Sequence, residues 1–222
     1  MKLDPRGPTE PFVCFSKPAG FTVGDFWRWG VSDLLVNTTR GAVAEFIVGQ
    51  ALGCAGPVRD SWGPFDLCTA DGIKVEVKSA SYRQAWKTAK PSRIQFDIAP
   101  ARAWDSETNK LSGEPKRHAD VYVFCLLNNE QQDPADPLKL DRWEFFVLGT
   151  NVLDAHCKSQ RTIGLNTVRK LKAINCDFTS LPQGVESAFH GRLVLQDPTV
   201  EPPSASLKRI ESNGEGQPAR AG

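Results

Sequence analysis

The sequence predicts a mixed α/β domain in which a β-sheet is flanked by helices. Apolar residues recur with helical spacing over 38–52. Apolar and polar residues alternate over 72–80 and again over 92–99, a pattern typical of strands with one buried face. Residues 119–128 form a nearly continuous apolar run of strand-forming residues, which indicates a buried strand at the centre of the sheet.

Length and composition predict one folded domain of ordinary size. The chain has 222 residues, of which 40% are hydrophobic and 24% are charged, as in soluble globular proteins. We place the domain at residues 20–195, after an irregular lead-in over 1–19. Residues 196–222 are rich in Pro, Gly, Ser and Glu and carry few large apolar side chains, so we expect a disordered tail.

The composition also restricts partners and location. The formal net charge is only +1, so nucleic-acid binding would have to come from a local basic patch. No apolar run approaches the roughly 18 residues of a membrane span, and the polar N-terminus is not a secretory signal. The six cysteines form no C-x-x-C pair and the three histidines are scattered, so zinc-ligand spacing is absent. We therefore expect a cytoplasmic protein with reduced cysteines and no membrane partner.

Two helices are expected near the N-terminus. Thr22 and Asp25 form a T-x-x-D start pattern ahead of large apolar residues, which predicts a helix within 20–36. The helix over 38–52 should end at Gly53. Three candidate N-cap residues precede this second helix: Asn37, Thr38 and Thr39.

A β-hairpin is expected directly after the second helix. The segments 64–70 and 72–80 flank the dipeptide Asp71-Gly72, which is a strong turn signal.

The rest of the domain supplies weaker patterns. We expect a short helix over 81–88, a third strand over 92–99 and a polar loop over 100–117. Residues 141–150 predict a further strand, and residues 165–174 predict a helix.

The expected hairpin brings acidic side chains together. Strand alternation places Glu76 and Lys78 on one face and Val75 and Val77 on the other. Asp66 lies on the partner strand, so its carboxylate should be a near neighbour of Glu76. Two carboxylates this close repel each other unless a cation lies between them. Oxygen ligands of this kind suit Mg²⁺, and Mn²⁺ as well.

Glu45 is a third candidate acid. It lies in the second helix, with Gly41 and Gly49 four residues away on either side. Glycine inside a helix costs about 1 kcal/mol relative to alanine, so two of them indicate a close backbone approach on this face. Glu45 would then enter the same crevice, although a solvent-facing helical glutamate also fits.

Basic residues are concentrated around the same strand. Ten basic and five acidic residues lie between Lys74 and Arg117, whereas the whole chain carries a net charge of only +1. Such an excess is the local footprint that phosphate binding requires. Four of these residues are our candidates for contacts with the nucleic-acid backbone: Arg83, Lys87, Lys90 and Arg93.

Three nearby polar or aromatic side chains remain undecided. Gln84 and Gln95 could hydrogen-bond a water or a phosphate, or lie on the surface. Trp86 could stack on a base, but a tryptophan between helix and sheet is more often part of the core.

Together these residues resemble the active-site pattern of the PD-(D/E)XK nuclease superfamily. The resemblance covers about residues 38–127 and includes the pattern R-G-x-x-A-E around Glu45, Asp66 in P-F-D, and the triplet Glu76-Val77-Lys78. The segment 40–53 resembles the first core helix of resolvase-like and RecB-like members, and the segment 136–150 resembles bacterial proteins of the superfamily.

The resemblance implies a restriction endonuclease-like core and a Mg²⁺-dependent DNA endonuclease active in restriction, defence or repair. Asp66 and Glu76 would bind the metal, and Glu45 would support it directly or through water. Lys78 would orient or activate the attacking water and neutralise phosphate charge. Double-stranded DNA is the expected substrate, and a homodimer is expected by analogy.

Two alternatives stay open on the sequence alone. One is a non-catalytic nucleic-acid-binding protein that keeps the nuclease fold. The other is a structural or interaction protein with a chance motif, because an E-x-K pair also occurs as an exposed ion pair on an ordinary strand.

Overall fold

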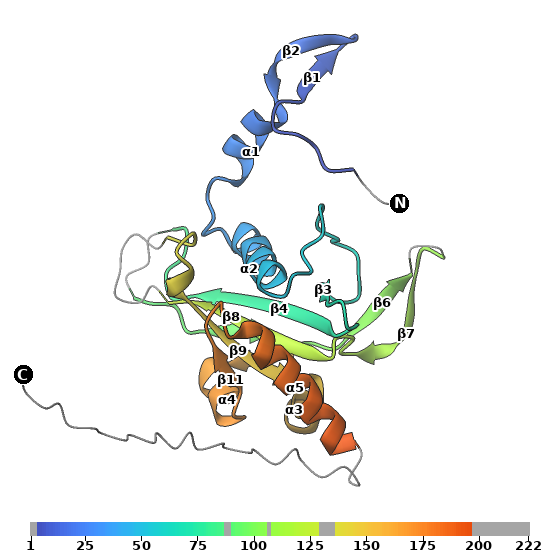
Figure 1. Ribbon diagram of the computed structural model, residues 1–222, viewed down its shortest axis with the longest axis vertical. Coiled ribbons are helices and arrows are strands. Elements are labelled where there is room, and N and C mark those ends of the chain that lie inside the picture. The colour runs from blue at the N-terminus through green and yellow to red at the C-terminus, as the bar shows by residue number, and fades with distance from the viewer. Residues whose placement is uncertain (1–3, 87–89, 106–107, 129–135, 197–222) are drawn as a thin grey trace, which may run out of the picture.

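A mixed five-stranded β-sheet forms the centre of the protein (Figure 1). The computed structural model describes residues 4–86, 90–105, 108–128 and 136–196. The sheet order is β11-β9-β8-β4-β3, in which β4 and β8 are parallel and the other neighbours are antiparallel. These strands are β3 (Leu67–Cys68), β4 (Lys74–Ser81), β8 (Val121–Leu127), β9 (Trp143–Gly149) and β11 (Ile174–Cys176).

The central strand is β8, as the apolar run predicts. All seven of its residues are buried, and it pairs along its whole length with both β4 and β9. A strand with neighbours on both edges and cover on both faces has no polar side, which explains its continuous apolar sequence.

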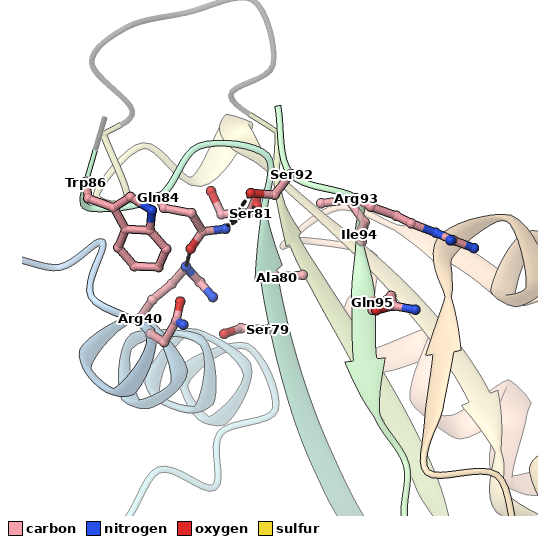
Figure 2. A pocket seen from close by; sticks show the side chains of 11 residues that line it. Arg40, Ser79, Ala80, Ser81, Gln84, Trp86, Ser92, Arg93, Ile94 and Gln95 are labelled. Atoms are coloured by element: carbon pink, nitrogen blue, oxygen red, sulfur yellow. Dashed lines mark hydrogen bonds between the residues drawn. The ribbon is translucent and has the colours of Figure 1, made fainter. Parts of the chain in front are cut away.

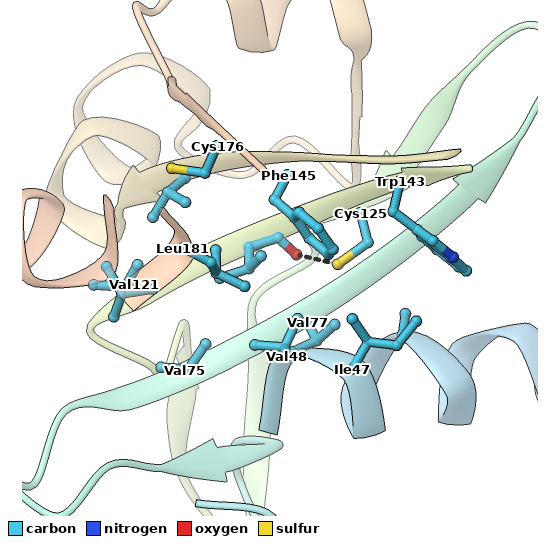
Figure 3. Packing of buried hydrophobic residues seen from close by; sticks show 14 of the residues in the cluster. Ile47, Val48, Val75, Val77, Val121, Cys125, Trp143, Phe145, Cys176 and Leu181 are labelled. Carbon is cyan, nitrogen blue, oxygen red and sulfur yellow. Dashed lines mark hydrogen bonds between the residues drawn. The ribbon is translucent and has the colours of Figure 1, made fainter. Parts of the chain in front are cut away.

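Helices cover both faces of the sheet. On one face, α2 (Asn37–Ala51) and α5 (Leu181–Gln196) pack against the sheet in a single apolar cluster. Figure 3 shows Ile47 and Val48 of α2 against Val77 of β4. The predicted class, a mixed sheet flanked by helices, is therefore confirmed.

The second face is covered by shorter elements. Residues of α3 (Thr150–Cys157) and α4 (Leu165–Lys170) share a cluster with side chains of β8 and β9. The small antiparallel pair of β5 (Gln95–Asp97) and β10 (Thr162–Gly164) joins the same cluster. The expected third strand is thus present as β5, but it pairs outside the main sheet.

The lead-in over 1–19, predicted to be irregular, contains regular structure from residue 11 onward. Strands β1 (Pro11–Cys14) and β2 (Lys17–Thr22) form an antiparallel hairpin that leads into α1 (Val23–Val31). Phe15 and Ser16 adopt the positive φ angles that Asn-Gly usually supplies in such a turn. Because neither residue is Asn or Gly, the sequence does not reveal the turn.

Helix α1 begins as the T-x-x-D pattern predicts. Thr22 and Asp25 cap the helix reciprocally through side chain and backbone. None of the residues of α1 is buried, and Figure 1 shows α1 and the β1–β2 hairpin projecting beyond α2, away from the sheet.

Two local predictions near α2 and β4 differ from the structure. The N-cap of α2 is Val36, without a side-chain cap, and the three polar candidates lie inside the first turn. Residues 82–86 are bends rather than a helix, because Ser81 Oγ and Gln84 Nε2 donate to nearby carbonyl groups. The remaining residues of that expected helix, 87 and 88, lie outside the described residues.

The segment 100–117 also differs, since it forms a second hairpin rather than a loop. Strands β6 (Ala101–Asp105) and β7 (Lys110–Lys116) pair with an irregular register. Positive φ angles at Asn109 and Gly113 allow the polar chain to turn and bend. A single 3-10 turn, η1 (Leu140–Arg142), precedes β9.

Other sequence predictions concern the cysteines, membrane helices and the tail. The six cysteines are free thiols. Within the described part of the chain, no helix is long and apolar enough to cross a membrane. The predicted disordered tail falls almost entirely on residues 197–222, which lie outside the described residues.

Two glycines of α5 give a test of how tightly this helix packs on the sheet. A Cβ atom at Gly184 would collide with Sγ of Cys176, whereas a Cβ atom at Gly191 would meet nothing within 4 Å. We expect Gly184→Ala to lower the free energy of unfolding by about 1–3 kcal/mol.

Gly191→Ala is the matched control and should raise the free energy of unfolding by up to about 1 kcal/mol through helix propensity. Urea unfolding of both variants measures the difference. Equal effects of the two substitutions would contradict the close approach at Gly184.

Candidate active site

The predicted hairpin is formed by β3 and β4. Leu67 pairs with Val75 and Cys68 pairs with Lys74, and the turn between them is closed by Gly72, whose φ is +82°. The amide of Gly72 donates to the carbonyl oxygen of Thr69 at 3.0 Å. The dipeptide Asp71-Gly72 therefore predicts this turn correctly.

Asp66 is the residue directly before β3, and its side chain hydrogen-bonds to the edge of β4. Strand β3 has only two residues, so the outer edge of β4 soon loses its strand partner. One carboxylate oxygen of Asp66, Oδ2, accepts the backbone N–H of Val77 at 2.7 Å and so replaces a ladder hydrogen bond. This bond fixes the carboxylate against β4.

The carboxylates of Asp66, Glu76 and Glu45 influence one another. Continuing the hairpin register by one residue places Asp66 opposite Glu76, which puts both on the same face of the sheet. Burial, followed by the negative charges of Glu76 and Glu45, raises the pKa of Asp66 from 3.8 to about 6. Both other acids therefore act electrostatically on Asp66, which lies in a partly buried crevice beside Glu76.

Lys78 forms an ion pair with Glu76 in this crevice. Lys78 Nζ donates to Glu76 Oε1 at 2.6 Å, and the two side chains are only 28% and 18% exposed. Burial alone would lower the pKa of Lys78, but Glu76, Asp66 and Asp97 together raise it above its usual value. The ammonium group is therefore charged at neutral pH beside two carboxylates.

Glu45 is held by a residue that the sequence analysis missed. Nε and Nη2 of Arg59 donate to the two carboxylate oxygens of Glu45, each at 2.5 Å. Glu45 is 11% exposed and Arg59 is 48% exposed. The hydrogen bond to Glu45 raises the pKa of Arg59, and the charge of Asp66 adds to this shift. Arg59 therefore adds a second cation to the crevice.

The chain reaches Arg59 through a tight reversal after α2. Gly53 has a φ of +64°, and the amides of Cys54 and Ala55 both donate to the carbonyl oxygen of Gly49. A Cβ atom at Gly49 would lie only 3.1 Å from Cβ of Ala55, but one at Gly41 would meet nothing within 4 Å. The predicted close backbone approach is thus correct for Gly49 and wrong for Gly41.

The donor set of this crevice consists of oxygen atoms. Among the described residues, no group of three or more His, Cys, Asp and Glu side chains is arranged to hold a metal ion. Asp66 and Glu76 remain as a pair of carboxylates on one hairpin, while both oxygens of Glu45 are occupied by Arg59. Mg²⁺ commonly takes one or two protein carboxylates, and waters and phosphate oxygens fill the remaining positions. The pair therefore has suitable chemistry for Mg²⁺ without a third protein ligand.

A cavity of about 450 Å³ opens further along β4 (Figure 2). It lies between the start of α2, the end of β4 and the segment that leads into β5. All three residues that the sequence left undecided line this cavity: Gln84, Trp86 and Gln95. Trp86 is 58% exposed, so it is not a core residue.

The four candidate backbone-binding residues are distributed unevenly. Arg93 is exposed and lines the cavity, and Lys90 is exposed but does not line it. Arg83 is half-buried next to the cavity-lining Gln84. Lys87 lies outside the described residues.

Comparison with known families identifies the class of protein as a nuclease. The family described as bacteriophage T4 endonuclease IV matches residues 30–167. This match covers more than half of the chain, so the protein belongs to the bacteriophage T4 endonuclease IV family. No curated protein matches the chain. The matched region includes α2, the β3–β4 hairpin, β8 and β9, and therefore every residue of the crevice described above.

Proposed function

We propose that this protein is a metal-dependent endonuclease of the PD-(D/E)XK type that hydrolyses phosphodiester bonds of DNA. The observation that carries the proposal is the crevice in which Asp66, Glu76 and Lys78 meet on one hairpin. The high pKa of Asp66 supports it, because a buried carboxylate beside the negative charge of Glu76 favours a bound cation.

Asp66 and Glu76 would hold a divalent cation, with Mg²⁺ or Mn²⁺ as the best fit to oxygen ligands. Such an ion would supply positive charge at the phosphate and would make an attacking water more acidic. Asp66 is already oriented by the Val77 N–H, so its free oxygen can face the crevice. Glu45 acts indirectly through Arg59, which it holds beside Asp66.

Lys78 would stabilise the transition state. Negative charge accumulates on the phosphate oxygens during hydrolysis, and a preorganised cation in a partly buried site stabilises that charge strongly. Glu76 orients the ammonium group, and the raised pKa of Lys78 keeps it protonated. A protonated lysine cannot take a proton from water, so we assign it electrostatic stabilisation rather than the role of general base.

DNA is the proposed substrate because family membership and charge agree. The family is one of endonucleases, and the segment that follows Lys78 carries the local excess of basic residues. A role in restriction, defence or repair and cleavage by a homodimer belong to the same proposal.

The test is cleavage of plasmid DNA and of single- and double-stranded oligonucleotides in Mg²⁺, Mn²⁺ or EDTA. We expect cleavage with Mg²⁺ or Mn²⁺ and none with EDTA. Glu76→Gln should reduce the rate at least about a hundredfold, since it removes both a metal ligand and the partner of Lys78. Glu114→Gln on β7 is the matched control and should keep the wild-type rate.

Two outcomes would contradict the proposal. Cleavage that persists in EDTA or in Glu76→Gln would rule out this metal site. DNA binding by the wild type without cleavage under any of these conditions would favour the non-catalytic alternative.

A further inference from the structure

Arg40 is a buried cation without a matching anion. It lines the cavity of Figure 2 and is only 5% exposed. Its Nη1 atom donates to the carbonyl oxygen of Leu35 at 3.2 Å and to Oε1 of Gln84 at 3.4 Å. Its Nε atom is buried without a hydrogen-bond partner, and within the described ranges no carboxylate forms an ion pair with it.

An isolated buried charge is costly, and its cost falls when a counter-charge binds beside it. Burial already lowers the pKa of Arg40. Among the described residues, Arg40 makes only long hydrogen bonds to neutral oxygens, which relieve little of this cost. The site therefore favours an anionic ligand.

The start of α2 adds to the positive character of the cavity. This helix has 15 residues, its N-cap is Val36 without a side-chain cap, and its first turn contains no acidic residue. Its free N–H groups and the positive end of its dipole favour an anion, and Asn37 of the same turn lines the cavity.

The other described residues of the cavity wall supply hydrogen-bond donors, and none of them is acidic. Arg93 brings a second guanidinium, and Ser79 and Ser81 of β4 and Ser92 bring hydroxyl groups. Gln84 is held in place by its amide nitrogen, which donates to the carbonyl oxygen of Ser81 and to Oγ of Ser92, both at 3.1 Å. Figure 2 shows Arg40, Gln84 and Trp86 together at one side of this space.

We propose that this cavity binds a non-scissile phosphate of the nucleic-acid strand that is cut at the crevice of Asp66, Glu76 and Lys78. The inference rests on the proposed function for the position of the scissile phosphate. Both sites lie along β4: Ala80, which lines the cavity, is two residues beyond Lys78, or roughly 7 Å along a strand. A nucleic-acid strand that runs along β4 can therefore place phosphates that are about two nucleotides apart in the two sites. Trp86, exposed at the rim, offers a surface on which a neighbouring base can stack.

The test measures binding of a fluorescent oligonucleotide by the full chain in EDTA, where proposed cleavage is stopped, over a range of salt concentrations. Arg40→Met keeps the length of the side chain and removes the charge. We expect it to weaken binding roughly ten- to a hundredfold. It should also reduce the slope of log affinity against log salt by about one phosphate contact.

Arg93→Gln is a second variant at an exposed position and should reduce the slope in the same way. Lys170→Gln, on α4 at the other face of the sheet, is the matched loss of charge and should change the slope less than either. Thermal unfolding of Arg40→Met provides a further readout. If Arg40 serves a ligand rather than the fold, its removal should not lower Tm.

Inorganic phosphate tests whether the cavity binds a phosphate of the nucleic acid or only free phosphate. We expect millimolar phosphate to raise the Tm of the wild type and to compete with the oligonucleotide, and to do neither in Arg40→Met. The proposal would be overturned if the cavity binds free phosphate but both variants keep the wild-type slope of log oligonucleotide affinity against log salt. Unchanged oligonucleotide binding in both variants, or a lower Tm in Arg40→Met without any change in slope, would also overturn it.

The test of the phosphate cavity can fail independently of the test of the proposed nuclease activity. Failure of the metal site appears as cleavage that does not depend on Glu76, whereas failure of the phosphate cavity appears in the binding slope of Arg40→Met. Each result can be obtained without the other.

Discussion

Replacing Lys78 with methionine is expected to slow DNA cleavage by about a hundred- to a thousandfold, the usual effect of removing one preorganised electrostatic group. The ammonium group lies 2.6 Å from Glu76 in a partly buried crevice, where its charge acts on the phosphate with little screening by solvent. The measurement is the single-turnover rate at saturating Mg²⁺, so that a change in DNA affinity does not enter the result.

Lys74→Met is the control for Lys78→Met. Lys74 begins the same strand and loses the same charge, but it is exposed and lies over the ring of Phe65 rather than in the crevice. We expect its rate to stay within a few-fold of the wild type. Equal losses in the two variants would show that only the general charge of the strand matters, and an unchanged rate in Lys78→Met would exclude the role assigned to it.

The elements that the sequence predicts best are those with local signals. The Asp71-Gly72 turn and the alternation of β4 locate the hairpin, because turn chemistry and strand period depend on neighbours in sequence. The apolar run of β8 locates the sheet centre for the same reason. These two strands also carry or support the predicted acids, so much of the crevice could be deduced in advance.

The residues that escaped prediction depend on contacts between distant segments. Arg59 lies in an irregular stretch, and only the reversal after α2 brings it to Glu45, 14 residues earlier. In the sequence, Arg40 is an ordinary residue in the first turn of a helix. Its burial without an anionic partner depends on the fold, which brings Gln84, 44 residues away, into contact with it. Burial and pairing of this kind have no periodic signature in a sequence.

Short strands escaped prediction for a different physical reason. The β1–β2 and β6–β7 hairpins turn through non-glycine residues with positive φ, such as Phe15, Ser16 and Asn109. Neither hairpin joins the main sheet, so their side chains are not selected for burial on one face. Without alternation or a glycine turn, such segments look like loops.

Replacing Asp66 with asparagine is expected to abolish metal-dependent cleavage and, in metal-free buffer at pH 7, to stabilise the fold by about 1–3 kcal/mol. The pKa of Asp66 is raised from 3.8 to about 6, so the folded state binds its proton more tightly than the unfolded state does. The contribution of Asp66 to the free energy of unfolding therefore decreases as pH rises from about 4 to about 6, and the full cost of about 3 kcal/mol is present above pH 6. Asparagine has no charge and can still accept the Val77 N–H, so it should escape this cost.

Urea unfolding of both proteins between pH 4 and pH 7.5, with and without Mg²⁺, measures this effect. The stability difference should be small at pH 4, grow towards pH 6 and then stay constant. Mg²⁺ should stabilise the wild type but not Asp66→Asn. A bound cation offsets both the cost of burying the charged carboxylate and its repulsion by Glu76. Asp71→Asn, at the exposed hairpin turn, should show neither effect. A wild type that is more stable than Asp66→Asn at pH 7 without metal would mean that Asp66 serves the fold, and the case for a cation between the two carboxylates would then lose its electrostatic basis.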